Sequence, residues 1–285
     1  MGMGIPRGYS SPAIKGFGGG MGVCALCRDK ADLINSHLIP AAAYKHVRGA
    51  VGGNGDSPVI IDGSDKTAFQ TDKQITQYLL CKECEDRFSR NGERILGKLW
   101  STRRGFPLLE KLAQENVIYA GNEFSVYGHE TLDSQILECL FYFAVSVFWR
   151  AHVWDWGGQK NSYGGALGEK YETEVRRFLL GDGALKEARI FVHLNTNSTY
   201  RSMIRLPSYL RKNGVTHHSF SILGIDFWLY VGGSVGKELK SLSQNNMLFA
   251  SSDFAKTNSL DKLAGMLQTN ILIKGKLAKR GLVGV

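Results

Sequence analysis

Two C-x2-C pairs constrain the fold of this chain more than any other feature of its sequence. Cys24 and Cys27 form the first pair, Cys81 and Cys84 form the second, and 53 residues separate the pairs. A two-residue spacing places two thiolates on the same side of a tight turn, and two such turns complete the tetrahedron that Zn2+ prefers. A thioredoxin-type redox pair would explain either half alone, but not a second copy. The pattern therefore predicts a closed, structural zinc site, with any chemistry supplied from elsewhere.

Composition limits the class of protein. Of the 285 residues, 43% are apolar, and 35 Lys and Arg against 26 Asp and Glu leave a net charge of +9. That apolar content can bury a real core, and the charge favours a polyanionic partner, although solubility also explains it. The longest mostly apolar run, Cys139–Trp149, is shorter than the ~20 residues of a membrane span, and no signal-peptide pattern opens the chain. We expect a cytoplasmic protein with no membrane partner, in which Cys139 is a buried small hydrophobe.

The segments beside the cysteine pairs hold the candidate chemistry. Ser36-His37-Leu38-Ile39-Pro40 follows the first pair, and a strand-like run, Ile75–Leu80, leads into the second. Glu85–Leu96 has apolar residues on one side at helical spacing, so it predicts a helix, which Gly92 weakens by about 1 kcal/mol. This order of elements describes a small unit with too little core of its own, which zinc would hold together.

This order resembles the HNH (His-Me finger) endonuclease family, in a zinc-stabilised bacterial and prophage branch with S-H-[IL]-I-P and L-L-C-x2-C-E motifs. The resemblance covers roughly residues 22–100, about a third of the chain. It implies an α+β protein with an N-terminal, zinc-pinned, treble-clef-like ββα-metal finger. The residues that carry it are Cys24, Cys27, Ser36-His37-Leu38-Ile39-Pro40, Leu79-Leu80-Cys81, Cys84-Glu85, Phe88, Ser89 and Glu93.

The resemblance also implies catalytic roles. His37 would be the general base, Glu85 would hold a divalent Mg2+ or Mn2+ ion, and Ser36 and Glu93 would support the ion or its water. Ser36 occupies the position where many members of the family have an Asp that binds the catalytic metal. Glu85 occupies the position of the last residue in the HNH motif, a His or Asn, and the motif's middle asparagine falls near Thr76. Each residue also has a plainer interpretation: a hydrogen-bonded core histidine at 37, a helix-dipole glutamate at 85 and a solvated glutamate at 93.

Basic residues offer candidate phosphate contacts. At 100° per residue, four basic side chains of the Glu85–Leu96 helix and its extension fall on the face opposite Glu85, so we expect a solvated face there. Better candidates are Arg103-Arg104, or Lys45 and Arg48. The end of the chain, 274–285, has four basic residues and no acid, which suits either a phosphate backbone or a solvated end. The four on the helix face are Arg87, Arg90, Arg94 and Lys98.

The rest of the chain predicts a different organisation. Residues 1–22 are interpreted as a flexible Gly-rich leader, 23–104 as the zinc unit, and 105–285 as a mixed α and β domain with a buried helix over Asp133–Trp154. Arg150 in that helix would need a partner, and Glu172, Glu174 or a phosphate are the candidates. A loop is expected at Gly49–Gly55. A second helix should run over Tyr171–Leu180 and stop at Gly181, with strands over Arg189–Leu194, His218–Leu223 and Asp226–Val231, the last two joined as a hairpin.

Three functions remain open on this sequence. The leading hypothesis is a metal-dependent HNH-type DNA endonuclease, a phosphodiester hydrolase acting in phage defence, restriction or a mobile element. RNA is an alternative substrate. The C-terminal domain would choose the target or a partner, which could be a second copy of the chain. The second hypothesis is an inactive, zinc-stabilised nucleic-acid-binding module, and the third is a structural zinc finger within an interaction protein.

Overall fold

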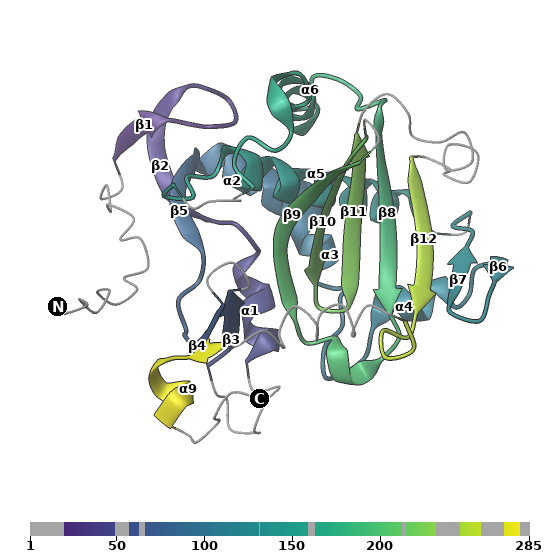
Figure 1. Ribbon diagram of the computed structural model, residues 1–285. Coiled ribbons are helices and arrows are strands. Elements are labelled where there is room, and N and C mark those ends of the chain that lie inside the picture. The colour runs from purple at the N-terminus through teal and green to yellow at the C-terminus, as the bar shows by residue number, and fades with distance from the viewer. Residues whose placement is uncertain are drawn as a thin grey trace.

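The computed structural model describes residues 20–48, 57–62, 66–130, 132–158, 163–212, 215–231, 246–257 and 271–279. These residues form a mixed α+β protein with one seven-stranded sheet and two three-stranded sheets (Figure 1). The leader expected over 1–22 lies outside them except for residues 20–22, two of which belong to a strand. The loop expected at Gly49–Gly55 also lies outside the described residues.

The seven-stranded sheet has the order β6-β7-β12-β8-β11-β10-β9. Its neighbours are antiparallel except for β12 and β8, which run parallel. The expected hairpin is confirmed, with its turn at Leu223-Gly224, where both residues have positive φ (47° and 87°). The strands are β6 (Val117–Ala120), β7 (Phe124–Tyr127), β8 (Ala188–Asn195), β9 (Ile204–Lys212), β10 (Val215–Ile222), β11 (Ile225–Val231) and β12 (Met247–Ser252).

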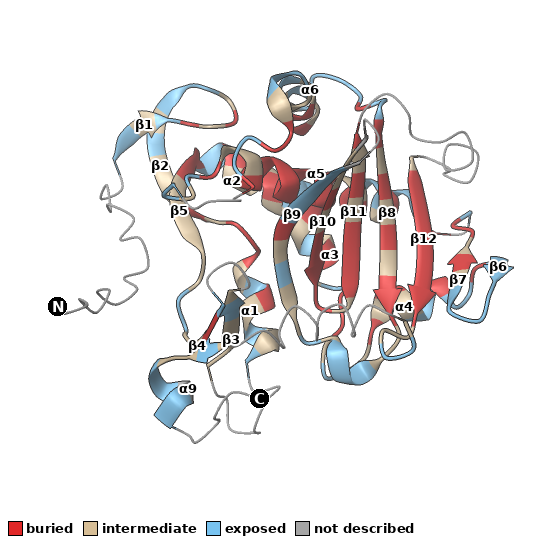
Figure 2. Ribbon diagram, viewed as in Figure 1, coloured by how far each residue is buried: buried red, intermediate tan, exposed pale blue. Residues whose placement is uncertain are grey.

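A buried helix, α5 (Ser134–Val153), packs against one face of this sheet (Figure 2). Asp133 caps its start by accepting a hydrogen bond from the Gln135 amide, as an N-cap carboxylate does. This 20-residue helix is long and apolar enough to cross a membrane by length and composition. However, 78% of its most apolar 18-residue stretch is buried inside the protein, as is usual for a core helix. The prediction of a buried central helix is therefore confirmed, as is the burial of Cys139.

Helix α6 (Gly168–Leu180) packs across α5 and ends where its sequence predicts. Gly181 has a φ of 89°, in the left-handed region that suits glycine after a helix. Two short elements complete this part: α4 (Pro107–Leu112) and a 3-10 turn, η2 (Ser198–Tyr200).

The N-terminal part (residues 20–104) contains the cysteine pairs. Strands β1 (Met21–Val23), β2 (Lys30–His37) and β5 (Thr76–Cys81) form an antiparallel sheet, and α1 (Ala41–Val47) follows β2. A continuous helix follows β5: α2 (Lys82–Phe88), a π-helical turn η1 (Ser89–Glu93) and α3 (Arg94–Leu96). The helix expected over 85–96 is thus present, and the π turn within it changes which side chains share a face.

The third sheet joins the two ends of the described chain. Its strands are β3 (Val59–Asp62), β4 (Thr67–Gln70) and β13 (Leu272–Ile273), and β13 pairs with β4 in parallel. Helix α9 (Gly275–Lys279) lies next to β4 (Figure 1). The described part of the basic C-terminal segment, 274–279, was grouped with residues 105–285 from the sequence but lies on the N-terminal part. One hydrophobic core runs from the cysteine pairs through α5 to the large sheet.

Candidate metal centre and adjoining polar site

The four cysteines of the two pairs come together in one cluster. The sulfur atoms of Cys24, Cys27, Cys81 and Cys84 all lie within 4.8 Å of one another, and Cys27 Sγ is 4.0 Å from Cys81 Sγ. Four sulfurs at about 2.3 Å from a central zinc would be about 3.8 Å apart, so the cluster has the dimensions of a metal site. The expectation that these cysteines meet at a site able to hold a metal ion such as zinc is confirmed.

The electrostatics of the thiols also suit a cation. A hydrogen bond with Cys84 lowers the pKa of Cys24 to about 4, and burial raises the pKa of Cys27 to about 11. The hydrogen bond with Cys24 raises the pKa of Cys84 far above its ordinary value. The protein alone thus favours a thiolate at Cys24, and the raised pKa values of Cys27 and Cys84 keep those two thiols protonated. A dication bound among the four sulfurs would let neighbouring thiols ionise together.

The first cysteine turn is held against the rest of the protein. Arg28 adopts a positive φ of 72° as the turn closes, and its amide donates to the Cys24 carbonyl at 3.0 Å. Arg176 of α6 donates to the Leu26 carbonyl at 3.2 Å, and Glu172 lies 3.3 Å from Arg28. Glu172 therefore joins α6 to the cysteine turn and does not pair with Arg150.

Arg150 instead reaches into the N-terminal part. Its guanidinium donates to the His37 carbonyl at 2.7 Å and to Glu93 Oε1 at 2.8 Å, and it lies 5.3 Å from the centre of the Phe88 ring. The arginine is fully buried. The prediction that Arg150 pairs with Glu172 or Glu174 was therefore wrong, because its acidic partner, Glu93, comes from the helix after the second cysteine pair. The interpretation of Glu93 as a solvated glutamate was wrong for the same reason.

Glu85 and Ser36 lie beside this ion pair. Burial raises the pKa of Glu85, whereas Arg150, Ser36 and His37 lie close enough to lower it. Ser36 is within hydrogen-bonding reach of Glu85, but Glu85 Oε2 and Ser36 Oγ are buried and no hydrogen bond of good geometry reaches either atom among the described residues. A buried carboxylate oxygen beside a hydroxyl forms a pair of hard oxygen donors, which fits a divalent ion or its water.

The π turn explains why Glu85 and Glu93 share a face. In a regular helix eight residues turn 800°, which leaves the two side chains about 80° apart. A π turn contains one residue more than an α-helical turn. The eight-residue separation therefore gives the rotation of about seven α-helical residues, and the angle between the two side chains falls to about 20°. Glu93 raises the pKa of Glu85, as a nearby carboxylate does.

His37 ends β2 and is half-buried, opposite Thr76 of β5 in the strand ladder. The next residue, Leu38, donates its amide to the Ile75 carbonyl at 3.0 Å, and the Ile75 amide donates to the Tyr44 hydroxyl at 3.3 Å. His37 is thus held at the end of a paired strand, and part of its surface is open to solvent or a ligand.

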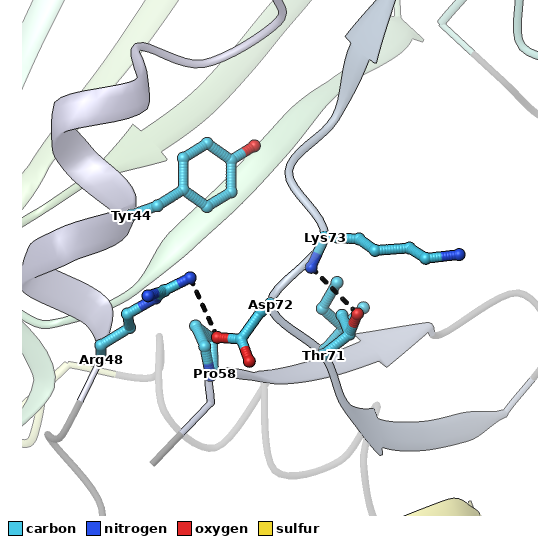
Figure 3. Close-up of a pocket in the computed structure, with 7 residues that line it drawn as sticks. Tyr44, Arg48, Pro58, Thr71, Asp72 and Lys73 are labelled. Carbon is cyan, nitrogen blue, oxygen red and sulfur yellow. Dashed lines mark hydrogen bonds and ion pairs between the residues drawn. The ribbon is translucent and has the colours of Figure 1, made fainter. Parts of the chain in front are cut away.

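The basic residues considered as phosphate contacts divide into groups. Arg90, Arg94 and Lys98 are exposed, as expected, but Arg87 donates to the Leu180 carbonyl at 2.7 Å and is not fully solvated. Arg48 pairs with Asp72 at 2.9 Å across a small pocket (Figure 3).

The sequence predicted the cysteine cluster and named His37, Glu85 and Glu93 as candidates, but it missed two features. It assigned the wrong partners to Arg150, although a lone arginine after Trp149 in an apolar helix was the signal for an unusual pairing. It also missed a buried contact of 2.5 Å between the Tyr163 hydroxyl and His218 Nδ1. Comparisons of the chain with protein-family models, curated proteins and solved structures find no match.

Proposed function

We propose that the protein is a metal-dependent endonuclease of the HNH type, which hydrolyses DNA phosphodiester bonds. The observation that carries the proposal is that Glu85, which follows Cys84, lies close enough to Ser36 and His37 for both to affect its pKa, with Glu85 Oε2 and Ser36 Oγ buried and without a well-formed hydrogen bond. Strands β2 and β5 are antiparallel, although α1, β3 and β4 lie between them in the chain, and β5 leads directly into the helix that bears Glu85. This pairing of two strands with one helix supports a ββα-metal finger.

The residues have separate roles in this proposal. His37 takes a proton from the water that attacks phosphorus, the bond from phosphorus to the 3′ oxygen breaks, and a 5′-phosphate and a 3′-hydroxyl are left. Glu85, with Ser36 beside it, would hold Mg2+ or Mn2+, which when bound supplies Lewis-acid stabilisation of the phosphate charge. Arg150 holds the His37 carbonyl and Glu93 in place.

The cysteine cluster has a structural role here. It ties the turn before β2 to the end of β5 and the start of α2. It thereby fixes the strand that ends at His37 against the helix that begins near Glu85, so that both can reach one phosphate.

The replacement of the usual aspartate by Ser36 favours a second candidate, a nucleic-acid-binding module without catalysis. A hydroxyl supplies one neutral oxygen where a carboxylate supplies charge, so the cation would bind more weakly. In that case the protein would bind DNA in a salt-dependent way without cleaving it.

Nicking of supercoiled plasmid in Mg2+ or Mn2+ tests the proposal. The wild-type protein should nick the plasmid, and His37→Ala and Glu85→Ala should lower the rate by at least the 10²-fold typical of a lost general base. His217→Ala is the matched control, because His217 is a half-buried histidine on the large sheet. Wild-type nicking by His37→Ala would overturn the assignment, and binding without nicking by the wild type would select the second candidate.

A further inference from the structure

Exposed basic side chains from three parts of the chain lie around the β13-β4-β3 sheet and its neighbouring helices. We name this group the basic surface. It combines two residues of the α1 segment, two residues beside β4, and two of the C-terminal helix α9, all exposed. Its members are Lys45, Arg48, Lys66, Lys73, Lys276 and Lys279.

The C-terminal segment is held in this place by the backbone. The Leu272 amide donates to the Lys66 carbonyl at 2.8 Å, and the Lys274 amide donates to the Ala68 carbonyl at 2.9 Å. Helix α9 starts directly afterwards and lies beside β4. Lys276 and Lys279 are three residues apart, so they project from the same face of that helix.

The basic surface is connected to the site at His37 by short contacts. Leu38 bonds to Ile75, and Ile75 bonds to the hydroxyl of Tyr44. Tyr44 lines the same small pocket as Arg48 and Lys73, as Figure 3 shows. The strand that ends at His37 and the basic surface are therefore neighbours within the N-terminal part.

The balance of charge identifies the partner. The described ranges 41–48, 57–62, 66–74 and 271–279, which contain the six cations, have two acids, Asp62 and Asp72. Asp72 pairs with Arg48, and both side chains remain well exposed. A DNA duplex has one phosphate charge about every 1.7 Å, so a row of separated lysines matches its backbone better than it matches a single small anion.

We propose that the basic surface binds the phosphate backbone of DNA next to the His37 site, and that residues 271–279 act as part of the DNA-binding surface. This inference rests on the proposed function. It assigns to the C-terminal segment a role in the N-terminal site, although more than 170 residues separate the segment from the second cysteine pair.

The test is DNA binding by the full chain, made in the His37→Ala background so that the DNA stays intact. The Lys276→Ala/Lys279→Ala variant is compared with Lys111→Ala/Lys186→Ala, whose lysines are exposed on α4 and just before β8 and whose loss removes the same charge. Fluorescence anisotropy of a short labelled duplex measures affinity between 50 and 200 mM salt, the range over which phosphate contacts weaken.

The slope of log affinity against log salt should become shallower by about 2 in the α9 variant, and the affinity at low salt should fall several-fold, because each lost phosphate contact removes about 0.9 from the slope. The control variant should keep the parent slope. An unchanged slope in the α9 variant, or an equal loss in the control, would overturn the inference while leaving plasmid nicking by the wild type intact. A wild-type protein that neither binds nor nicks DNA would instead refute the proposed function, and the basic surface with it.

Discussion

Replacing Arg150 with methionine tests how far the N-terminal site depends on α5. Methionine keeps an apolar stem of similar length but cannot donate to the His37 carbonyl or to Glu93, which now accept at 2.7 and 2.8 Å. Removing one member of a buried ion pair costs about 3–5 kcal/mol, since the other charge stays behind. The Glu93 side chain is 20% exposed and can be partly rehydrated, so we expect the lower end, about 3 kcal/mol.

The partner residue sharpens this prediction. Glu93→Gln keeps an oxygen acceptor but leaves the buried Arg150 charge without its counter-ion, so it should also cost about 3 kcal/mol. The double variant should cost less than the two single variants together by roughly 1 kcal/mol, because the two residues act as one pair. Arg90→Met is the control. Its arginine is exposed on the same helical segment, and its loss should change stability by about 0.5 kcal/mol or less.

Urea unfolding, monitored by tryptophan fluorescence, measures these free energies of unfolding. Plasmid nicking, compared between variants at the same concentration of folded protein, measures activity. Nicking by Arg150→Met should fall further than the unfolded fraction explains, since the backbone of His37 loses its anchor. A stability change below about 1 kcal/mol, with additive single and double variants, would show that the pair does not hold the site.

Three further predictions concern the metal, the helix crossing and pH. Metal analysis should find about one zinc ion per chain, lost in Cys84→Ala and retained in Cys139→Ala, and a chelator should lower the melting temperature of the wild type. Gly92→Ala should destabilise the protein in urea unfolding by about 1–2 kcal/mol, because the new Cβ would lie 3.0 Å from Phe143 Cβ and the cost of overpacking exceeds the helix propensity gained. Burial lowers the pKa of His193 to about 4, below the unfolded value near 6.5, so the stability it contributes is present above pH 6.5 and is lost as the pH falls toward 4. Between pH 7 and 5 this loss should be about 2 kcal/mol, and unfolding curves of His193→Gln should show a smaller loss over the same range.

Much of the fold follows from local sequence pattern. The helix α5 is apolar almost all round, and such a helix has to be buried. The stop of α6 at Gly181 and the turn at Leu223-Gly224 depend on backbone conformations that glycine adopts easily. The meeting of Cys24 and Cys81 could be predicted because metal-ligand spacing is a strong local signal for a contact between distant segments.

The features that the sequence could not supply are non-local. The partner of Arg150 depends on how α5 crosses the helix of the second cysteine pair, and Glu93 is one of several acids that could have met it. The π turn arises where Gly92 approaches the backbone of Phe143, a contact that no periodicity encodes. The position of β13 could not be predicted, because a strand of two residues is too short to show an alternating hydrophobic pattern.

The bond between Arg150 and the His37 carbonyl joins residues 113 positions apart, which sets an order of events during synthesis. At 5–20 residues per second, a ribosome needs roughly 6 to 23 seconds to add the arginine after the histidine. The cysteines of both pairs are already made by then. A nascent chain can therefore assemble its metal cluster well before the side chain that anchors His37 exists, and the polar site is completed only after most of α5 has left the ribosome.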